Sequence, residues 1–313
     1  TTLRARFDRY NAERLSRLYS SFADPRLIDL FEALPFLIAN NQPSLPGYIP
    51  SDEIVSGMYG YVPTGRGLAF IRNKFPQTQI AQQDKKDVFI QMFALMGSGG
   101  TIAFNEQSDL DFWVCANESK YSEEAISNFR KKCHAIAEWV DENFNLEIHF
   151  FLNDIEKVKQ NVFDEDEDEA FTGSALGVLL KEEFFRSSIV VAGKVPFWWV
   201  VPADTTDAAY AQWLTLANDA GIMDSFIDLG NLYSIAKEEF LGSAIFQILK
   251  SLGNPYKSII KLGLLERYIR GSAGNPFISN IIKKNVHAGK YDLDSVDSYV
   301  IMFNEVYNYY SSV

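Results

Sequence analysis

The chain has 313 residues, 47% of them hydrophobic, and a formal net charge of −12. This apolar content supports a hydrophobic core, which excludes a mainly disordered chain. The acidic balance argues against a nucleic-acid interface, because such interfaces need clustered Lys and Arg. A small anionic ligand bridged by a cation fits the charge better. With two cysteines, no signal pattern and no membrane-spanning run, we expect a cytoplasmic chain with no membrane partner.

The first 41 residues show the periodicity of two helices, the second starting near Pro25. From Asn41 to Gly67 the sequence becomes rich in proline and glycine, which predicts a long irregular segment. Long loops in compact domains are often functional. We therefore consider two alternatives for this segment, a lid or side wall of a ligand site and a plain surface connection.

The most informative stretch runs from Leu95 to Cys115, after an apolar run that starts at Val88. An apolar run ends in Gly97-Ser98-Gly99-Gly100, and a second apolar run then carries Asp109 and Asp111. Aspartate is depleted in strands, so two of them at alternate positions need an explanation. Because strand side chains alternate between faces, we expect Asp109 and Asp111 on one face with Trp113, and Leu110, Phe112 and Val114 on the other.

Two adjacent carboxylates repel each other unless a cation lies between them. Mg²⁺ prefers carboxylate and phosphate oxygens, so the pair predicts a magnesium site. The glycine-serine segment could hold a phosphate through backbone N–H groups, the Ser98 hydroxyl and the start of a helix. Taken singly, each motif has an ordinary alternative, a flexible turn for the glycines and a strand end for the aspartates. Together they resemble the pattern of polymerase-β-like nucleotidyltransferases.

That family uses a third carboxylate on a later strand. Ser122 has the character of a helix N-cap, and the helix that follows it leads to a strand over 146–152. Glu147 and His149 alternate in this strand and should share a face. We expect Glu147 to join the metal site and His149 to pack or to form a hydrogen bond nearby.

Further elements follow in the second half of the chain. Residues 175–186 read as a helix and 195–200 as a buried strand that closes the sheet. From residue 205 onward the pattern is helical, which indicates an α+β fold followed by a helical lobe. We divide the chain into a catalytic domain with N-terminal helices, residues 1–204, and a helical domain, residues 205–313. In the helical part, Lys250, Lys257, Ser258 and Lys261 could face the cleft and hold phosphates, or could be ordinary surface residues.

Several sequence blocks together resemble the catalytic portion of the bacterial class I adenylyl (adenylate) cyclases. The resemblance extends over residues 45–266 and keeps the order of the blocks. The blocks are LPGY (45–48), MGS (96–98), SDLDFWVC (108–115), LEIHFFL (146–152), EEFFR (182–186), AGK (192–194), VP (201–202), EEFLGSAIFQILK (238–250) and NPYKSIIK (254–261).

The resemblance implies a polymerase-β-like nucleotidyltransferase sheet flanked by helices. It also implies conversion of ATP to 3′,5′-cyclic AMP and pyrophosphate by two Mg²⁺ ions, for which Mn²⁺ could substitute. Asp109, Asp111 and Glu147 would bind the metals, while Gly97, Ser98 and the residues near Lys257 would bind the triphosphate. The regulatory region that follows in this family lies outside the sequence.

Two other functions remain open at this stage. The same carboxylates could transfer AMP from ATP to a separate acceptor hydroxyl. Alternatively, the chain could be a non-catalytic nucleotide sensor that has kept the fold, although such a module would not need three metal ligands.

Overall fold

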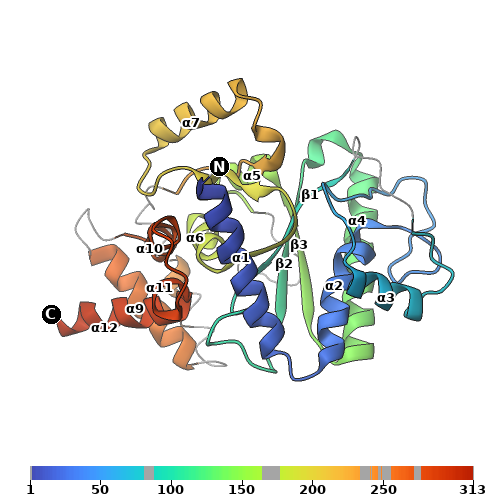
Figure 1. Ribbon diagram of the computed structural model, residues 1–313, viewed down its shortest axis with the longest axis horizontal. Coiled ribbons are helices and arrows are strands. Elements are labelled where there is room, and N and C mark those ends of the chain that lie inside the picture. The colour runs from blue at the N-terminus through green and yellow to red at the C-terminus, as the bar shows by residue number, and fades with distance from the viewer. Residues whose placement is uncertain are drawn as a thin grey trace.

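A small mixed β-sheet lies between two groups of helices in the computed structural model (Figure 1). The two groups cover opposite faces of the sheet and bury two hydrophobic cores. Among the described residues, no helix has the combination of length and apolar composition that crossing a bilayer requires. The structure describes residues 2–80, 88–163, 177–232, 240, 242–245, 248, 255–270 and 276–312, with the side chains of 255–257 left out.

The sheet has the strand order β3-β2-β1-β4. β1 is antiparallel to both of its neighbours, and β2 is parallel to β3. A parallel pair requires a long crossover, which is provided here by helix α4. The strands are β1 (Ile90–Met96), β2 (Leu110–Ala116), β3 (Ile148–Asp154) and β4 (Ile189–Gly193), and α4 is Glu123–Phe144.

One face of the sheet packs against α2 (Pro25–Ala39), α3 (Gly65–Lys74) and α4. Phe93 and Phe112 stack on this face with ring centroids 4.8 Å apart. The helix starts agree with the sequence: Pro25 is the first residue of α2, and the Ser122 side chain accepts the N–H of Ala125 to cap α4.

The other face carries Trp113, whose ring stacks on Phe184 of α6 (Gly177–Ser187). Helix α1 (Thr2–Ser21) lies along the β4 edge, where Asn11 both donates to and accepts from the backbone of Val190 at 2.8 Å. This pairing covers the edge strand. The remaining helices are α5 (Ile155–Lys159), α7 (Asp207–Asp219), α9 (Pro255–Arg270), α10 (Ile278–His287), α11 (Leu293–Val296) and α12 (Ser298–Ser311), with short 3₁₀ turns η1 (Glu118–Lys120), η3 (Phe197–Val200) and η4 (Met223–Ser225).

The prediction that a strand over 195–200 closes the main sheet is wrong. The fourth strand is β4, which ends where Gly193 adopts a φ of +94° and the chain turns. Within 195–200 only β5 (Val195–Pro196) is a strand, and it pairs with β6 (Phe226–Ile227) in a separate two-stranded sheet. The region after residue 205 is therefore not entirely helical. Proline cannot donate to a ladder, which explains why the main sheet does not continue through Pro196.

The proline- and glycine-rich segment is irregular as expected up to Gly65, where α3 begins. Its residues Leu45, Val55 and Met58 are buried in the same core as Phe112. Met58 forms a bridge with Ile90, at the start of β1. The connection from Gly97 to Ser108, here called the glycine-serine loop, follows the other end of β1. These residues of the segment therefore pack on the face opposite to Asp111, which favours the plain connection over the lid.

Helix α4 buries a lysine in this core. Lys132 is 0% exposed, and its ammonium donates to the carbonyl of Asn40. Burial lowers the pKa of Lys132 to about 8. The folded protein therefore binds fewer protons at this site than the unfolded chain between about pH 8 and the ordinary lysine pKa near 10.4.

This difference leads to a pH-dependent stability. Because the unfolded state binds more protons in that interval, the contribution of Lys132 to stability rises with pH, by about 2 kcal/mol from pH 7 to pH 10. We expect the free energy of unfolding of the wild type to rise by this amount relative to Lys132→Met, measured by urea denaturation across the interval. The exposed neighbour variant Lys131→Met should run parallel to the wild type, and a constant gap between wild type and Lys132→Met would contradict the assignment.

Candidate active site

Asp109 and Asp111 lie at the start of β2. Asp109 directly precedes the strand and is exposed, while Asp111 is half-buried and pairs with Met96, the last residue of β1. Leu110 and Phe112 belong to one core, and Trp113 belongs to the other. The alternation expected from the sequence is thus confirmed: the two carboxylates share the face of Trp113.

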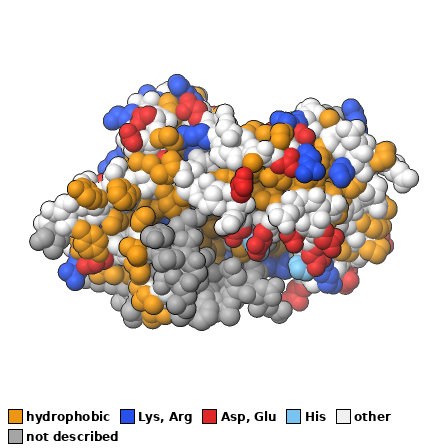
Figure 2. All heavy atoms as spheres, turned by 90° about the horizontal axis from the view of Figure 1, so that it is seen from below, with side chains coloured by type: hydrophobic (Ala, Val, Ile, Leu, Met, Phe, Trp, Pro, Cys, Tyr) orange, Lys and Arg blue, Asp and Glu red, His pale blue; other side chains and the backbone are white. Residues whose placement is uncertain are grey.

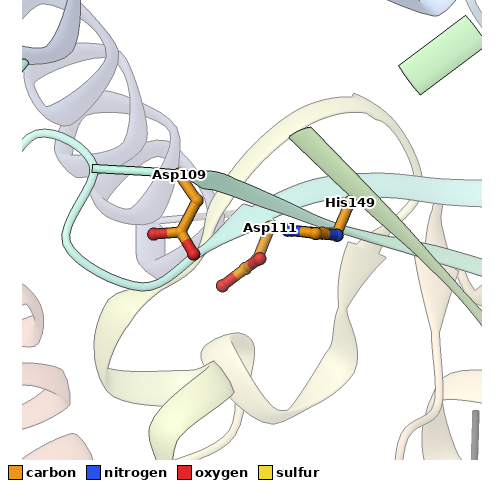
Figure 3. Close-up of side chains that lie close together, drawn as sticks. All are labelled: Asp109, Asp111 and His149. Carbon is orange, nitrogen blue, oxygen red and sulfur yellow. The ribbon is translucent and has the colours of Figure 1, made fainter. Parts of the chain in front are cut away.

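These two carboxylates form a compact group with His149. One ligand atom from each of Asp109, Asp111 and His149 lies within 4.8 Å of the others, and this is the only such group of three found among the described residues. Figure 3 shows both carboxylates directed into the same space, with the imidazole beside Asp111. His149 reaches this position because it pairs directly with Asp111 in the parallel ladder between β2 and β3.

Glu147 lies at the edge of this group. It directly precedes β3, and its backbone carbonyl accepts the N–H of Leu110 at 3.0 Å. Its carboxylate is 3.1 Å from His149 Nε2, and its side chain is 71% exposed. The structure therefore places Glu147 next to the imidazole and outside the three-residue group. The sequence predicted that Glu147 and His149 share a face. It could not predict that His149 pairs with Asp111, because this register depends on the pairing of β2 with β3.

The glycine-serine loop follows β1 directly and so begins beside Asp111. Residues 97–109, all of which the structure describes, contain turns and bends but no helix, so the helix that could have begun here is absent. The loop is held from three sides: the Gly97 N–H donates to Ser187 Oγ at 3.1 Å, Arg14 donates to the Gly99 carbonyl at 2.6 Å, and the Ile102 N–H donates to Asp297 at 2.9 Å. These partners come from α6, α1 and the N-cap of α12.

One glycine in the loop is required by its conformation. Gly100 has a φ of +66°, and a Cβ built there would lie 2.5 Å from the Arg14 carbonyl oxygen. A side chain would therefore displace either the loop or α1. Gly97 also has a positive φ, and a Cβ built there would meet no atom of the described residues within 4 Å.

The phosphate-binding residues expected in the helical part are only partly described. Lys250 and the side chain of Lys257 lie outside the described residues. Ser258 is 2% exposed, and Lys261 forms an ion pair with Glu183 at 2.9 Å. Glu183 is one helical turn before Ser187, so this pair connects Lys261 to the element that contacts Gly97.

Arg186 shares the same carboxylate. Its guanidinium is 3.3 Å from Glu183 and 3.4 Å from Glu182. Burial disfavours the charge on Arg186, but the two carboxylates outweigh this effect and raise its pKa above the ordinary value. Glu182 also accepts the N–H of Ser279, at the start of α10. This buried cluster fastens the C-terminal helices to α6, next to the glycine-serine loop.

The donor set fits a divalent cation. Two carboxylates at a half-exposed strand start leave space for waters and for phosphate oxygens, which is how Mg²⁺ and Mn²⁺ are commonly bound. Acidic side chains also gather on the face seen in Figure 2, which looks at the molecule from below. Fold and site together define a mixed α+β protein with an acidic centre, of the kind that suits a metal-bridged phosphate ligand.

The chain belongs to the class-I adenylate cyclase family. The family model described as adenylate cyclase NT domain matches residues 1–199, and that described as adenylate cyclase, class-I, second domain matches residues 235–313. The similar curated relatives include proteins named adenylate cyclase. Those from Salmonella typhimurium and Escherichia coli are 28% identical over the whole chain, and one from Yersinia pestis is 29% identical over 98% of it. The chain spans 36–37% of the length of these relatives. No solved structure showed significant similarity.

Proposed function

We propose that this chain carries the catalytic site of an adenylate cyclase, which converts ATP into 3′,5′-cyclic AMP and pyrophosphate. The observation that carries the proposal is the pairing of Met96 with Asp111, which brings the glycine-serine loop to the carboxylates of Asp109 and Asp111. A triphosphate could then contact the loop while its α-phosphate faces the acidic pair. Membership of the class-I adenylate cyclase family supports the same reaction.

In this reaction the ribose 3′-oxygen attacks the α-phosphorus of the same nucleotide, and the bond to pyrophosphate breaks. Asp109 and Asp111 would hold Mg²⁺ or Mn²⁺ at the α-phosphate end of ATP. Two such ions would supply the positive charge that lowers the pKa of the 3′-hydroxyl and stabilises the transition state. The carboxylate of Glu147, which lies beside the group, adds negative charge that would attract these ions.

The loop residues act on the leaving group. Ser98 directs its hydroxyl to the pyrophosphate, where negative charge accumulates as the bond breaks. Gly97 keeps the approach open because it carries no side chain. Lys261 reaches the pyrophosphate by exchanging the carboxylate of Glu183 for a phosphate oxygen, with Lys250, Lys257 and Ser258 as the neighbouring candidates on the same part of the chain.

The same observations support a polymerase-β-like nucleotidyltransferase fold. The antiparallel pair β1 and β2, joined by the glycine-serine loop, places alternating aspartates at the start of β2, and a parallel β3 lies next to them. Within this proposal, residues 1–204 form the catalytic domain and 205–313 the helical domain. Because the relatives are longer than this chain, a regulatory region beyond it is part of the proposal.

The test is product analysis. The purified chain is incubated with ATP and MgCl₂ or MnCl₂ without any acceptor, and the nucleotides are separated by anion-exchange chromatography. We expect cyclic AMP and pyrophosphate in equal amounts. If AMP appeared only as an adduct after an acceptor hydroxyl was added, the chain would be a nucleotidyltransferase instead. ATP that remained intact under all these conditions would refute both functions.

A further inference from the structure

His149 lies in the same group as Asp109 and Asp111, where the sequence predicted a third carboxylate. It is held in register with Asp111 by the parallel ladder, so its position is set by the backbone of two adjacent strands. Neighbouring strands lie about 4.8 Å apart. Side chains directly across such a pair point to the same face, and here that face also carries Asp109. The imidazole is consequently built into the acidic group.

The spacing of the group suits direct coordination. Around an octahedral ion with ligands at about 2.1 Å, ligand atoms are separated by about 3.0 to 4.2 Å. The three ligand atoms here lie within 4.8 Å of one another, so a shift of less than about 1 Å per side chain would close the shell. Asp109 is exposed and precedes the regular strand, which lets its side chain make most of this adjustment.

Glu147 contacts the same imidazole. Its carboxylate lies 3.1 Å from Nε2, which leaves Nδ1 as the nitrogen with a free lone pair when Nε2 carries the proton. Histidines that bind metals commonly donate their other N–H to a carboxylate, which orients the ring and raises its basicity. Glu147 and His149 form such a carboxylate–imidazole contact, next to the two aspartates.

From this geometry we propose that His149 is a nitrogen ligand of the cation bound by Asp109 and Asp111, and that Glu147 is a positioning residue acting through His149. This inference deepens the proposed function and rests on the metal site in it. A mixed set of two carboxylates and one imidazole favours Mn²⁺ over Mg²⁺, because imidazole is a softer donor than oxygen and Mg²⁺ keeps its oxygen shell. The site should therefore bind Mn²⁺ at least about ten-fold more tightly than Mg²⁺.

The experiment is pulsed electron paramagnetic resonance on the full chain with one equivalent of Mn²⁺ and no nucleotide. We expect electron spin echo modulation from a directly bound ¹⁴N nucleus, and its replacement by a ¹⁵N signal when only the histidines are ¹⁵N-labelled. His149→Asn should remove the nitrogen signal. Glu147→Gln should keep it, while Mn²⁺ affinity falls by about ten-fold through loss of the orienting carboxylate. His134→Asn, which changes an exposed histidine of α4, is the matched control and should behave like the wild type.

Two results would overturn the proposal: a wild-type spectrum without nitrogen modulation, or modulation that persists in His149→Asn. Loss of Mn²⁺ binding in Glu147→Gln with no nitrogen signal in the wild type would make Glu147 the ligand instead. The wild-type spectrum with and without ¹⁵N-labelled histidines shows whether a histidine binds Mn²⁺, even where a variant does not fold. Since no ATP is present, a nitrogen signal from a chain that makes no cyclic AMP would refute the proposed function and leave this inference intact.

Discussion

Replacing Asp111 by asparagine should lower the rate of cyclic AMP formation by at least about 100-fold, because it removes one of the two carboxylates that bind the cation opposite the α-phosphate. Asparagine has nearly the same shape, so the strand pairs with Met96 and His149 should persist. Removing one of two adjacent negative charges also relieves their repulsion, so the melting temperature should stay constant or rise slightly. The measurements are initial rates at saturating Mn²⁺ and thermal unfolding without metal.

The matched control for this variant is Glu106→Gln. Glu106 is an exposed acid in the same connection between β1 and β2, outside the group of Asp109, Asp111 and His149. Glu106→Gln removes one negative charge a few residues from Asp111 but no ligand of the cation. The rate should therefore stay within about two-fold of the wild type. Equal losses in Asp111→Asn and Glu106→Gln would show that general electrostatics, and not a ligand at position 111, controls the rate.

The largest effect on stability is expected for Trp113→Ala. Trp113 is 1% exposed, and its ring stacks on Phe184 with centroids 4.2 Å apart and 12° between the planes. Removing a buried indole from a packed core costs the transfer free energy of the ring and leaves a cavity, together about 3 to 5 kcal/mol. The same change removes the contact that seats α6 against β2, two residues from Asp111. Urea denaturation should show this loss in the free energy of unfolding.

Trp213→Ala is the control for aromatic loss. Trp213 lies on α7 and is 43% exposed, so its removal should cost less than about 1 kcal/mol. Similar midpoints for Trp113→Ala and the wild type would mean that the packing of α6 on the sheet contributes little to stability. In that case the seating of α6 would have to come from the buried charges of Arg186 and Glu182.

The sequence predicted local structure best where a single element carried a strong pattern. The apolar and acidic alternation from Leu110 to Val114 correctly assigned both faces of β2, and Ser122 correctly marked the start of α4. Prediction failed where two elements competed. The apolar residues from Val195 to Val200 suit a strand, but Gly193 turns the chain and Pro196 cannot extend the ladder, so Trp198 and Trp199 enter the second core from a 3₁₀ turn.

For the candidate site, the sequence by itself determined which residues could bind a cation and a phosphate: the aspartate pair, the glycine-serine loop and the alternating Glu147 and His149. These properties depend on residue type and on a period of two along one strand, which a sequence records directly. Only the tertiary structure decided that His149, and not Glu147, joins the two aspartates, and that Ser187 and Asp297 hold the loop. The reason is physical: strand register and helix docking depend on contacts between segments far apart in the chain, and periodicity within one segment carries no information about them.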